Sequence, residues 1–147
     1  MPPIRIIQPL ALLFLLPLLC SCRTYLACGD LQLASRNYNE MIRWNLADAA
    51  VPAQVAEGVR DAYRQRLEAA RQARVTDCRV RNLECDPDKG EAKVLLEIDY
   101  YLPPSTRVRT LQDTQQWRLG ADGDKNGWRI GTLLPDFNAL DINGGKQ

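Results

Sequence analysis

The spacing of apolar residues changes at Val75, and this change constrains the fold more than any other feature of the chain. Before it, apolar residues recur every three or four positions, which is typical of amphipathic helices. After it, they alternate with polar residues, which is typical of strands with one buried face. Helices followed by strands predict an α+β domain, in which N-terminal helices pack on a curved antiparallel sheet.

Two helices are predicted in the first half of the chain. Apolar residues follow one stripe over residues 31–50 and another over residues 53–74. Pro52 is expected to separate the helices, because proline disfavours helical geometry in the residue before it and fits the first turn of a following helix. The arginines on the other side of the second helix are interpreted as a solvated face, with a partner-binding face as the alternative.

Four strands are predicted in the second half. They are expected over residues 75–85, 91–102, 106–119 and 128–134. The segments between them are rich in proline, glycine and aspartate, which turns favour. Consecutive strands joined by turns indicate a four-stranded antiparallel meander.

An apolar run over residues 4–19 opens the chain, and Arg5 carries its only charge. A basic start, an apolar stretch and small residues at the cleavage position are the layout of a signal peptide. A membrane-spanning helix needs about 20 apolar residues, and this run is shorter and contains two prolines. We therefore expect residues 1–21 to be a signal peptide.

The sequence L-C-S-C at 19–22 resembles the lipobox of bacterial lipoproteins, in which an aliphatic, a variable and a small residue precede the acylated cysteine. The resemblance implies cleavage before Cys22, lipid with palmitate-type chains on Cys22, and a lipidated tether over residues 22–30. Cys20 stands where a smaller residue is commoner. The alternatives are an ordinary cleaved signal peptide and an uncleaved anchor.

The lipobox resemblance also implies a location. Arg23, rather than aspartate, follows Cys22, and by the sorting rules of enteric bacteria this favours the periplasmic face of the outer membrane. We expect a protein of the bacterial cell envelope whose contact with the membrane is the lipid on Cys22. Each buried methylene contributes about 0.8 kcal/mol, so several acyl chains hold a protein in place.

Three cysteines, at 28, 78 and 85, remain in the mature chain, and the exported compartment permits a disulfide. Cys78 and Cys85 lie on one predicted strand, roughly 23 Å apart at about 3.3 Å per residue, which is too far to bridge. A disulfide would therefore join Cys28 to Cys78 or to Cys85. Buried free thiols are the alternative.

Composition excludes several classes of function. The chain has no histidine, 19 basic residues and 18 acidic ones. The commonest general base and metal ligand is therefore missing, and no C-x-x-C motif replaces it. A balanced charge offers no broad attraction for nucleic acid. We expect no metal, no cofactor and no nucleic-acid partner.

The order of elements over residues 31–137 resembles the NTF2-like (cystatin-like cone) superfamily, with residues 138–147 as a flexible tail. Short stretches similar to those of small uncharacterised NTF2-like lipoproteins are Y-N-E-M-I-R-W at 38–44, Y-Y-L-P-P-S at 100–105 and G-W-R-I at 127–130. The superfamily includes isomerases and dehydratases, which use an acid or base inside the cone.

Five residues are candidates for such a role: Tyr38, Tyr63, Asp99, Tyr100 and Asp113. Asp99 alternates away from the apolar face of its strand, which predicts a solvated carboxylate. The tyrosines of the helices lie on apolar stripes, which predicts core packing. The register of Asp113 stays open. We therefore expect no catalytic residue and no enzyme.

The third strand is unusually polar, and Arg107, Arg109 and Gln115 are candidates for an interaction surface. A solvent-facing side of an antiparallel sheet is the alternative.

The tryptophans, Trp44, Trp117 and Trp128, are expected in the core. The resulting hypothesis is a non-enzymatic protein-interaction or scaffold module with another envelope protein as partner. The alternatives are a small-ligand-binding domain and a pocket enzyme of the isomerase or dehydratase type, and both require a cavity.

Overall fold

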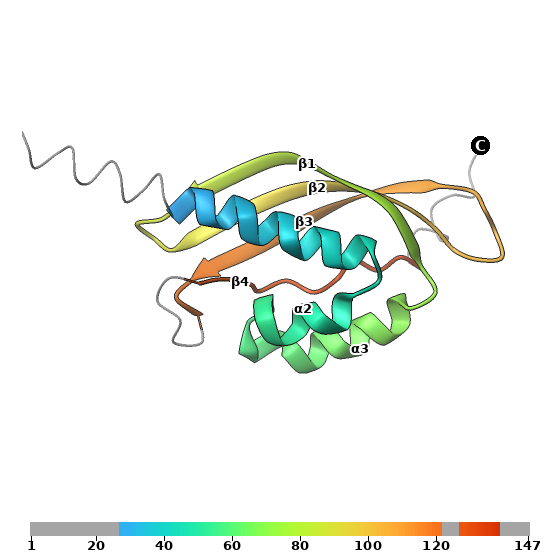
Figure 1. Cartoon of the computed structure of the whole chain (residues 1–147), viewed down its shortest axis with the longest axis horizontal. Helices are drawn as coiled ribbons and strands as arrows, with labels where there is room; N and C mark the ends of the chain where they lie inside the picture. Colours follow the sequence, from blue (N-terminus) through green and yellow to red (C-terminus); the bar gives the residue numbers. More distant parts are fainter. Residues whose placement is uncertain (1–26, 122–126, 139–147) are drawn as a thin grey trace, which may run out of the picture.

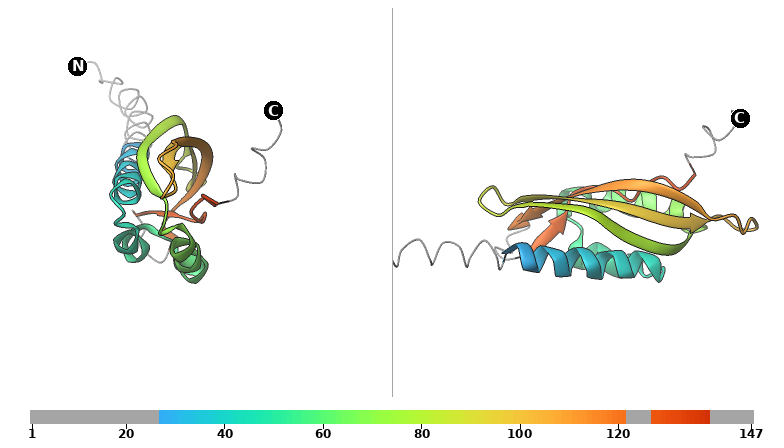
Figure 2. Two further views of the ribbon diagram at one scale, coloured as in Figure 1. Left: turned by 90° about the vertical axis from the view of Figure 1, so that its right-hand side faces the viewer. Right: turned by 90° about the horizontal axis from the view of Figure 1, so that it is seen from above.

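The computed structural model describes residues 27–121 and 127–138 of the chain. The predicted signal peptide, Cys22, the first part of the tether, the middle of the last predicted turn and most of the predicted tail lie outside the described residues. The described part has two layers, a curved sheet and helices that cover one of its faces (Figures 1 and 2). The α+β architecture predicted from the change in periodicity is confirmed at this level.

The sheet has four antiparallel strands in chain order. They are β1 (Arg74–Asp86), β2 (Glu91–Tyr101), β3 (Arg109–Leu119) and β4 (Trp128–Ile130). Gly90 has a φ of 65° in the turn between β1 and β2, a conformation that glycine adopts without steric cost. The predicted meander is therefore confirmed.

Strand β4 is shorter than predicted, because the chain leaves the sheet after Ile130. Leu134 and Phe137 are buried in the core instead of continuing the ladder. The Phe137 ring packs edge-on against Tyr100 at 4.9 Å between centroids, and its carbonyl accepts a hydrogen bond of 3.0 Å from the Tyr100 hydroxyl. Burial of these two side chains therefore stabilises the fold more than further pairing of β4 would.

Strand β1 bends at two irregularities in its pairing with β2. The register shifts between Val75 and Asp77 and again between Val80 and Asn82. An extra residue in one strand of a pair bends that strand and increases its twist. The two bulges lie in an edge strand and account for the curvature with which the sheet wraps toward the helices (Figure 2).

The first helix spans residues 27–43, so residues 27–30, which the sequence placed in the tether, are helical. The predicted end at residue 50 is wrong. Asn45 has a φ of 59°, and its amide donates to Ile42 at 3.1 Å while the amide of Leu46 donates to Met41 at 2.7 Å. These two bonds form a Schellman motif, in which asparagine, like glycine, tolerates the left-handed conformation.

The break between the next helices is also displaced from its predicted position. Pro52 lies inside α2 (Ala47–Gln54), and α3 (Arg60–Ala70) follows a 3₁₀ turn, η1 (Glu57–Val59). Between them Val55 is extended and bridges to Ile130 of β4, and Ala56 donates to the Ile130 carbonyl at 2.9 Å. Pairing with the sheet, rather than proline, therefore interrupts the helix.

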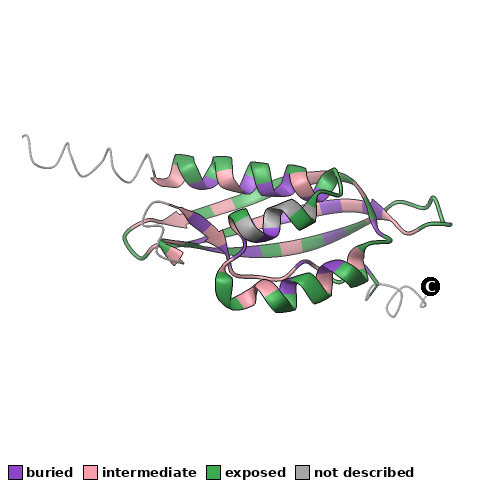
Figure 3. Ribbon diagram, turned by 60° about the horizontal axis from the view of Figure 1, so that its bottom comes forward, coloured by how far each residue is buried: buried purple, intermediate pink, exposed green. Residues whose placement is uncertain are grey.

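The core lies between the sheet and the helices. Buried residues occupy the sides of the helices and strands that face one another (Figure 3). In β2 the alternation is regular, with Ala92, Val94, Leu96, Ile98 and Tyr100 buried. Trp117 and Trp128 are buried as predicted.

Candidate functional site

A pair of tyrosines lies under the helices. The hydroxyls of Tyr38, on the first helix, and Tyr63, on α3, are 2.7 Å apart, and both side chains are fully buried. The Tyr38 ring also packs edge-on against Trp117, with centroids 5.7 Å apart. Burial raises the pKa of both hydroxyls, so both are neutral and each satisfies the other. Both tyrosines therefore pack in the core, as predicted.

Asp113 lies on the inner face of the sheet, opposite Leu96 of β2. It shares that face with the buried side chains of Leu111 and Trp117, and burial raises the pKa of its carboxyl to about 6. The negative charge of Asp113 in turn raises the pKa of Tyr38 and of Tyr63. Asp113 can therefore exchange a proton near pH 6 in the middle of the fold.

Cys78 is a half-buried free thiol on the same face, paired with Ile98. Burial first, and then the charge of Asp77, raise the pKa of the thiol to about 12, against a lowering effect of Arg43. The thiolate is the nucleophilic form of cysteine. Cys78 is therefore protonated at neutral pH and inert as a nucleophile.

Gln115 is only 2% exposed, so its predicted place on an interaction surface is wrong. Its side-chain amide donates to Asn39 at 2.8 Å and its carbonyl accepts from the Trp117 indole at 3.2 Å. Asn39 in turn donates to Ser35 at 3.3 Å. This chain of hydrogen bonds satisfies buried polar groups between the first helix and β3, and it indicates a structural role.

The other two residues of the predicted surface lie apart from Gln115. Arg107 is exposed in the connection between β2 and β3, which extends three residues further than predicted before β3 begins at Arg109. Arg109 is half-buried and pairs with Tyr100. The three residues therefore do not form one patch.

Asp99 lies on the outer face of the sheet in an ion-paired network. Its carboxylate accepts from Arg79 at 2.6 Å and from Thr110 at 2.6 Å. These hydrogen bonds, that from Arg79 first, lower its pKa. Arg79 also pairs with Asp77 at 2.7 Å. Asp99 is thus ionised and engaged with neighbouring strands, while Tyr100 is buried in the core.

Three hollows of about 290, 300 and 200 Å³ lie at the surface. The first is beside the β1–β2 turn, the second between the first helix, the end of α2 and β4, and the third beside α3. None of the three is lined by Tyr38, Tyr63 or Asp113. The inner-face groups with raised pKa therefore pack against protein rather than against these hollows.

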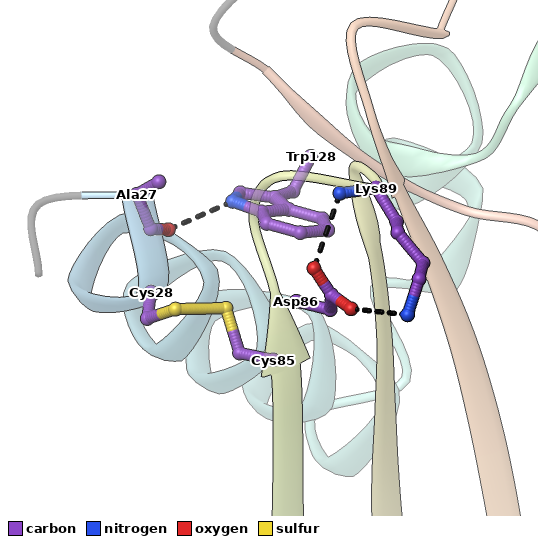
Figure 4. Close-up of a disulfide and its surroundings, with 6 residues drawn as sticks. All are labelled: Ala27, Cys28, Cys85, Asp86, Lys89 and Trp128. Carbon is purple, nitrogen blue, oxygen red and sulfur yellow. Dashed lines mark hydrogen bonds and ion pairs between the residues drawn. A yellow bond between two sulfur atoms is a disulfide. The ribbon is translucent and has the colours of Figure 1, made fainter. Parts of the chain in front are cut away.

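A disulfide ties one end of the first helix to the sheet (Figure 4). Cys28 is bonded to Cys85, with Cα atoms 6.0 Å apart, and the chain separation is 57 residues. The Trp128 indole donates to the Ala27 carbonyl at 2.9 Å. In the adjoining turn, Asp86 accepts from the amide of Lys89 at 3.1 Å and from its ammonium group at 2.7 Å. The start of the first helix, β1 and β4 are thus joined at one place.

Trp44, at the end of the first helix, is 66% exposed, so the prediction that it is a core residue is wrong. Its indole N–H donates to Glu40 at 2.9 Å, and the Arg43 guanidinium lies 5.6 Å from the ring centroid. Leu46, two residues on, is also exposed. Trp44 stands three residues after Met41, which fits the apolar stripe of a longer helix, but the helix ends at residue 43.

Among the described residues, no three histidine, cysteine, aspartate or glutamate side chains are grouped as metal ligands would be. The same residues include no helix that is both long and apolar enough to cross a membrane.

Comparison of the chain with family models, with curated proteins and with solved structures finds no match. The residues and their geometry therefore carry the functional argument.

Proposed function

We propose that this chain is a non-enzymatic interaction module of the bacterial envelope, anchored by lipid on Cys22 and built on an NTF2-like domain. Its partner is another envelope protein, and the membrane is the periplasmic face of the outer membrane. The observation that carries the proposal is the exposure of Trp44 at the end of the first helix, where it is 66% open to solvent.

An exposed tryptophan supports a binding role for energetic reasons. Large aromatic side chains are usually well buried, and apolar area gains roughly 25 cal/mol per Å² when it leaves water. Tryptophan and arginine also dominate the residues whose truncation weakens protein interfaces most. Trp44 and Arg43 stand together here, with the arginine over the ring.

Trp44 is also held in place before any partner arrives. Its hydrogen bond to Glu40 and its contact with Arg43 come from its own helix. A side chain that is already ordered loses less conformational freedom on binding. In the core, by contrast, the tyrosine hydroxyls bond to each other and the Gln115 amide bonds to Asn39. Buried groups that are already paired in this way support a module that binds rather than one that reacts.

Site-specific photocrosslinking in cells tests the proposal. A photoreactive residue at position 44 of the full chain is expected to capture a discrete envelope protein. The control is position 33, because Leu33 lies on the same helix and is 57% exposed, similar to Trp44. Equal capture at both positions, or no capture at 44, would contradict the proposal.

Small-ligand binding is the second candidate, and one observation favours it. Gln54 lines the hollow of about 300 Å³ between the first helix and β4, and its buried side-chain carbonyl has no hydrogen-bond partner among the described residues. A ligand with a donor would satisfy it. Substitution Gln54→Leu should then abolish any thermal stabilisation by that ligand.

A further inference from the structure

We infer that the disulfide between Cys28 and Cys85 determines which surface of the domain contacts the membrane. The end formed by the β1–β2 turn (residues 86–90) lies against phospholipid headgroups, and the end that carries Trp44 points away from the bilayer. This inference rests on the proposed lipid on Cys22, and it adds an interaction surface and a partner to that proposal.

The two ends of the domain are well separated. In Figure 1 the first described residues and the β1–β2 turn lie at one end of the molecule, and the β2–β3 connection lies at the other. The first helix runs along β1, since Cys28 is bonded to Cys85 while Arg43 acts on Cys78. From Cys28 to Trp44 the helix rises about 24 Å, at about 1.5 Å per residue.

The extended tether is slightly shorter than that distance. Cys28 stands six positions after Cys22, and an extended chain spans at most about 3.5 Å per position, or roughly 21 Å. The bonded partner, Cys85, is followed directly by the β1–β2 turn. The turn is therefore held near the lipid. The bilayer surface excludes many of the orientations in which the end that carries Trp44 would approach the membrane.

The disulfide keeps the tether short. Next to Cys28 stand Gly29 and Asp30, which are exposed and poor helix formers, and the first fully buried residue of the helix is Leu31. Without the covalent bond, the hydrogen bond from the Trp128 indole to the Ala27 carbonyl still holds this turn, and loss of that bond as well would let it unwind as far as Leu31. The tether would then have nine residues and reach roughly 32 Å at about 3.5 Å per residue.

Covalent geometry rather than charge determines this contact. The turn contains Asp86, Asp88 and Lys89, and the ammonium group of Lys89 is already paired with Asp86 at 2.7 Å. A mixed-charge turn has little net attraction for anionic headgroups. The orientation should therefore be independent of salt, unlike one produced by a basic patch.

Fluorescence quenching on vesicles tests the inference. The lipidated full chain, with Cys78→Ser to remove the free thiol, is placed in vesicles of phosphatidylethanolamine and phosphatidylglycerol that carry a headgroup nitroxide. A fluorophore is attached through Asp88→Cys in the turn or through Ser105→Cys in the β2–β3 connection, where both native residues are exposed. We expect loss of fluorescence at 88 and none at 105, unchanged at high salt.

Equal quenching at the two positions, or stronger quenching at 105, overturns the inference. A difference that vanishes at high salt overturns the argument from covalent geometry. The double substitution Cys28→Ser, Cys85→Ser removes the disulfide without leaving a free thiol. It should narrow the difference between the positions, and an unchanged difference means that the disulfide does not set the orientation.

Intact mass separates this inference from the proposed function. A chain without the added mass of a diacylglyceryl group overturns the anchoring, and the inference with it. A lipidated chain with equal quenching overturns the inference alone. A chain that begins at Arg23, and so lacks both the signal peptide and the lipid, provides the control, because it should remain off the vesicles and show quenching at neither position.

Discussion

Asp113 is a carboxyl whose charge the fold disfavours. Burial raises its pKa from 3.8 to about 6, so the folded chain binds this proton more tightly than the unfolded chain does. This tighter proton binding raises the free energy of unfolding in full below about pH 4. The contribution declines as the pH rises toward 6 and is lost above it.

Substitution Asp113→Asn should consequently stabilise the protein at pH 8 and have little effect at pH 4. A shift of about two pKa units corresponds to roughly 3 kcal/mol, and partial exposure to solvent reduces the expected gain to about 1–2 kcal/mol. Urea unfolding at the two pH values measures it. Asp88→Asn in the exposed β1–β2 turn is the control, and an equal gain at both pH values would refute the account.

The buried pair of Tyr38 and Tyr63 allows a double-mutant cycle. Either single change to phenylalanine leaves the other hydroxyl buried without its 2.7 Å partner, at a cost of about 1–3 kcal/mol. The double variant removes both polar groups and should recover much of that loss. Unfolding free energies of the four proteins test this, and strictly additive losses would show that the hydroxyls do not depend on each other.

Residue-level prediction from sequence succeeded for the helix tyrosines and failed for Gln115. Polarity placed Gln115 outside, but the register of β3 places it on the same face as Leu111 and Trp117. Its main partner, Asn39, is 76 residues away in the chain. A polar residue whose burial depends on such a distant partner carries no local signal.

At the scale of elements, the end of the first helix depends on a single residue. Asn45 has a φ of 59°, which L-residues with a β-carbon adopt at a cost. Substitution Asn45→Gly should leave the protein as stable or more stable, whereas Asn45→Val should destabilise it by about 1–2 kcal/mol. Thermal unfolding compares the two variants, and equal melting temperatures would contradict the Schellman assignment.

The disulfide joins two elements that are 57 residues apart in the chain. Closing a loop of this length in the unfolded state predicts a stabilisation of about 4 kcal/mol as an upper value. The double variant Cys28→Ser, Cys85→Ser should therefore lose roughly 2–4 kcal/mol of unfolding free energy. Reduction of the native protein should give a similar loss. If neither the double substitution nor reduction lowers the unfolding free energy, the covalent bond does not stabilise this fold.

Element boundaries could be predicted only where the cause is local. The alternation in β2 is local, and that strand lies within one residue of its predicted range. The break after α2 depends on Val55 pairing with Ile130, 75 residues later, and the end of β4 depends on burial of Leu134 and Phe137. Pro52 is a strong local signal for a helix boundary. It predicted the wrong boundary because the actual break depends on this distant pairing.

At the scale of the whole molecule, folding and proposed binding depend on different tryptophans. Trp117 is buried, packs on Tyr38 and donates to Gln115, so it joins the sheet to the first helix. Trp44 contacts only its own helix among the interactions described for it. Substitution Trp117→Ala should cost about 3–5 kcal/mol of unfolding free energy, and Trp44→Ala less than about 1 kcal/mol.

The same two variants separate the binding function from the fold. With a photoreactive residue at position 46, beside Trp44 on the exposed helix end, Trp44→Ala should lower the yield of captured partner while membrane attachment and stability persist. Trp117→Ala should instead lower the amount of folded protein and, in proportion, the yield. If capture per folded molecule falls only with Trp117→Ala, the partner recognises a surface that depends on the packed core and not the helix end. If it falls only with Trp44→Ala, the helix end is the binding element and the rest of the domain holds it at a set distance from the membrane.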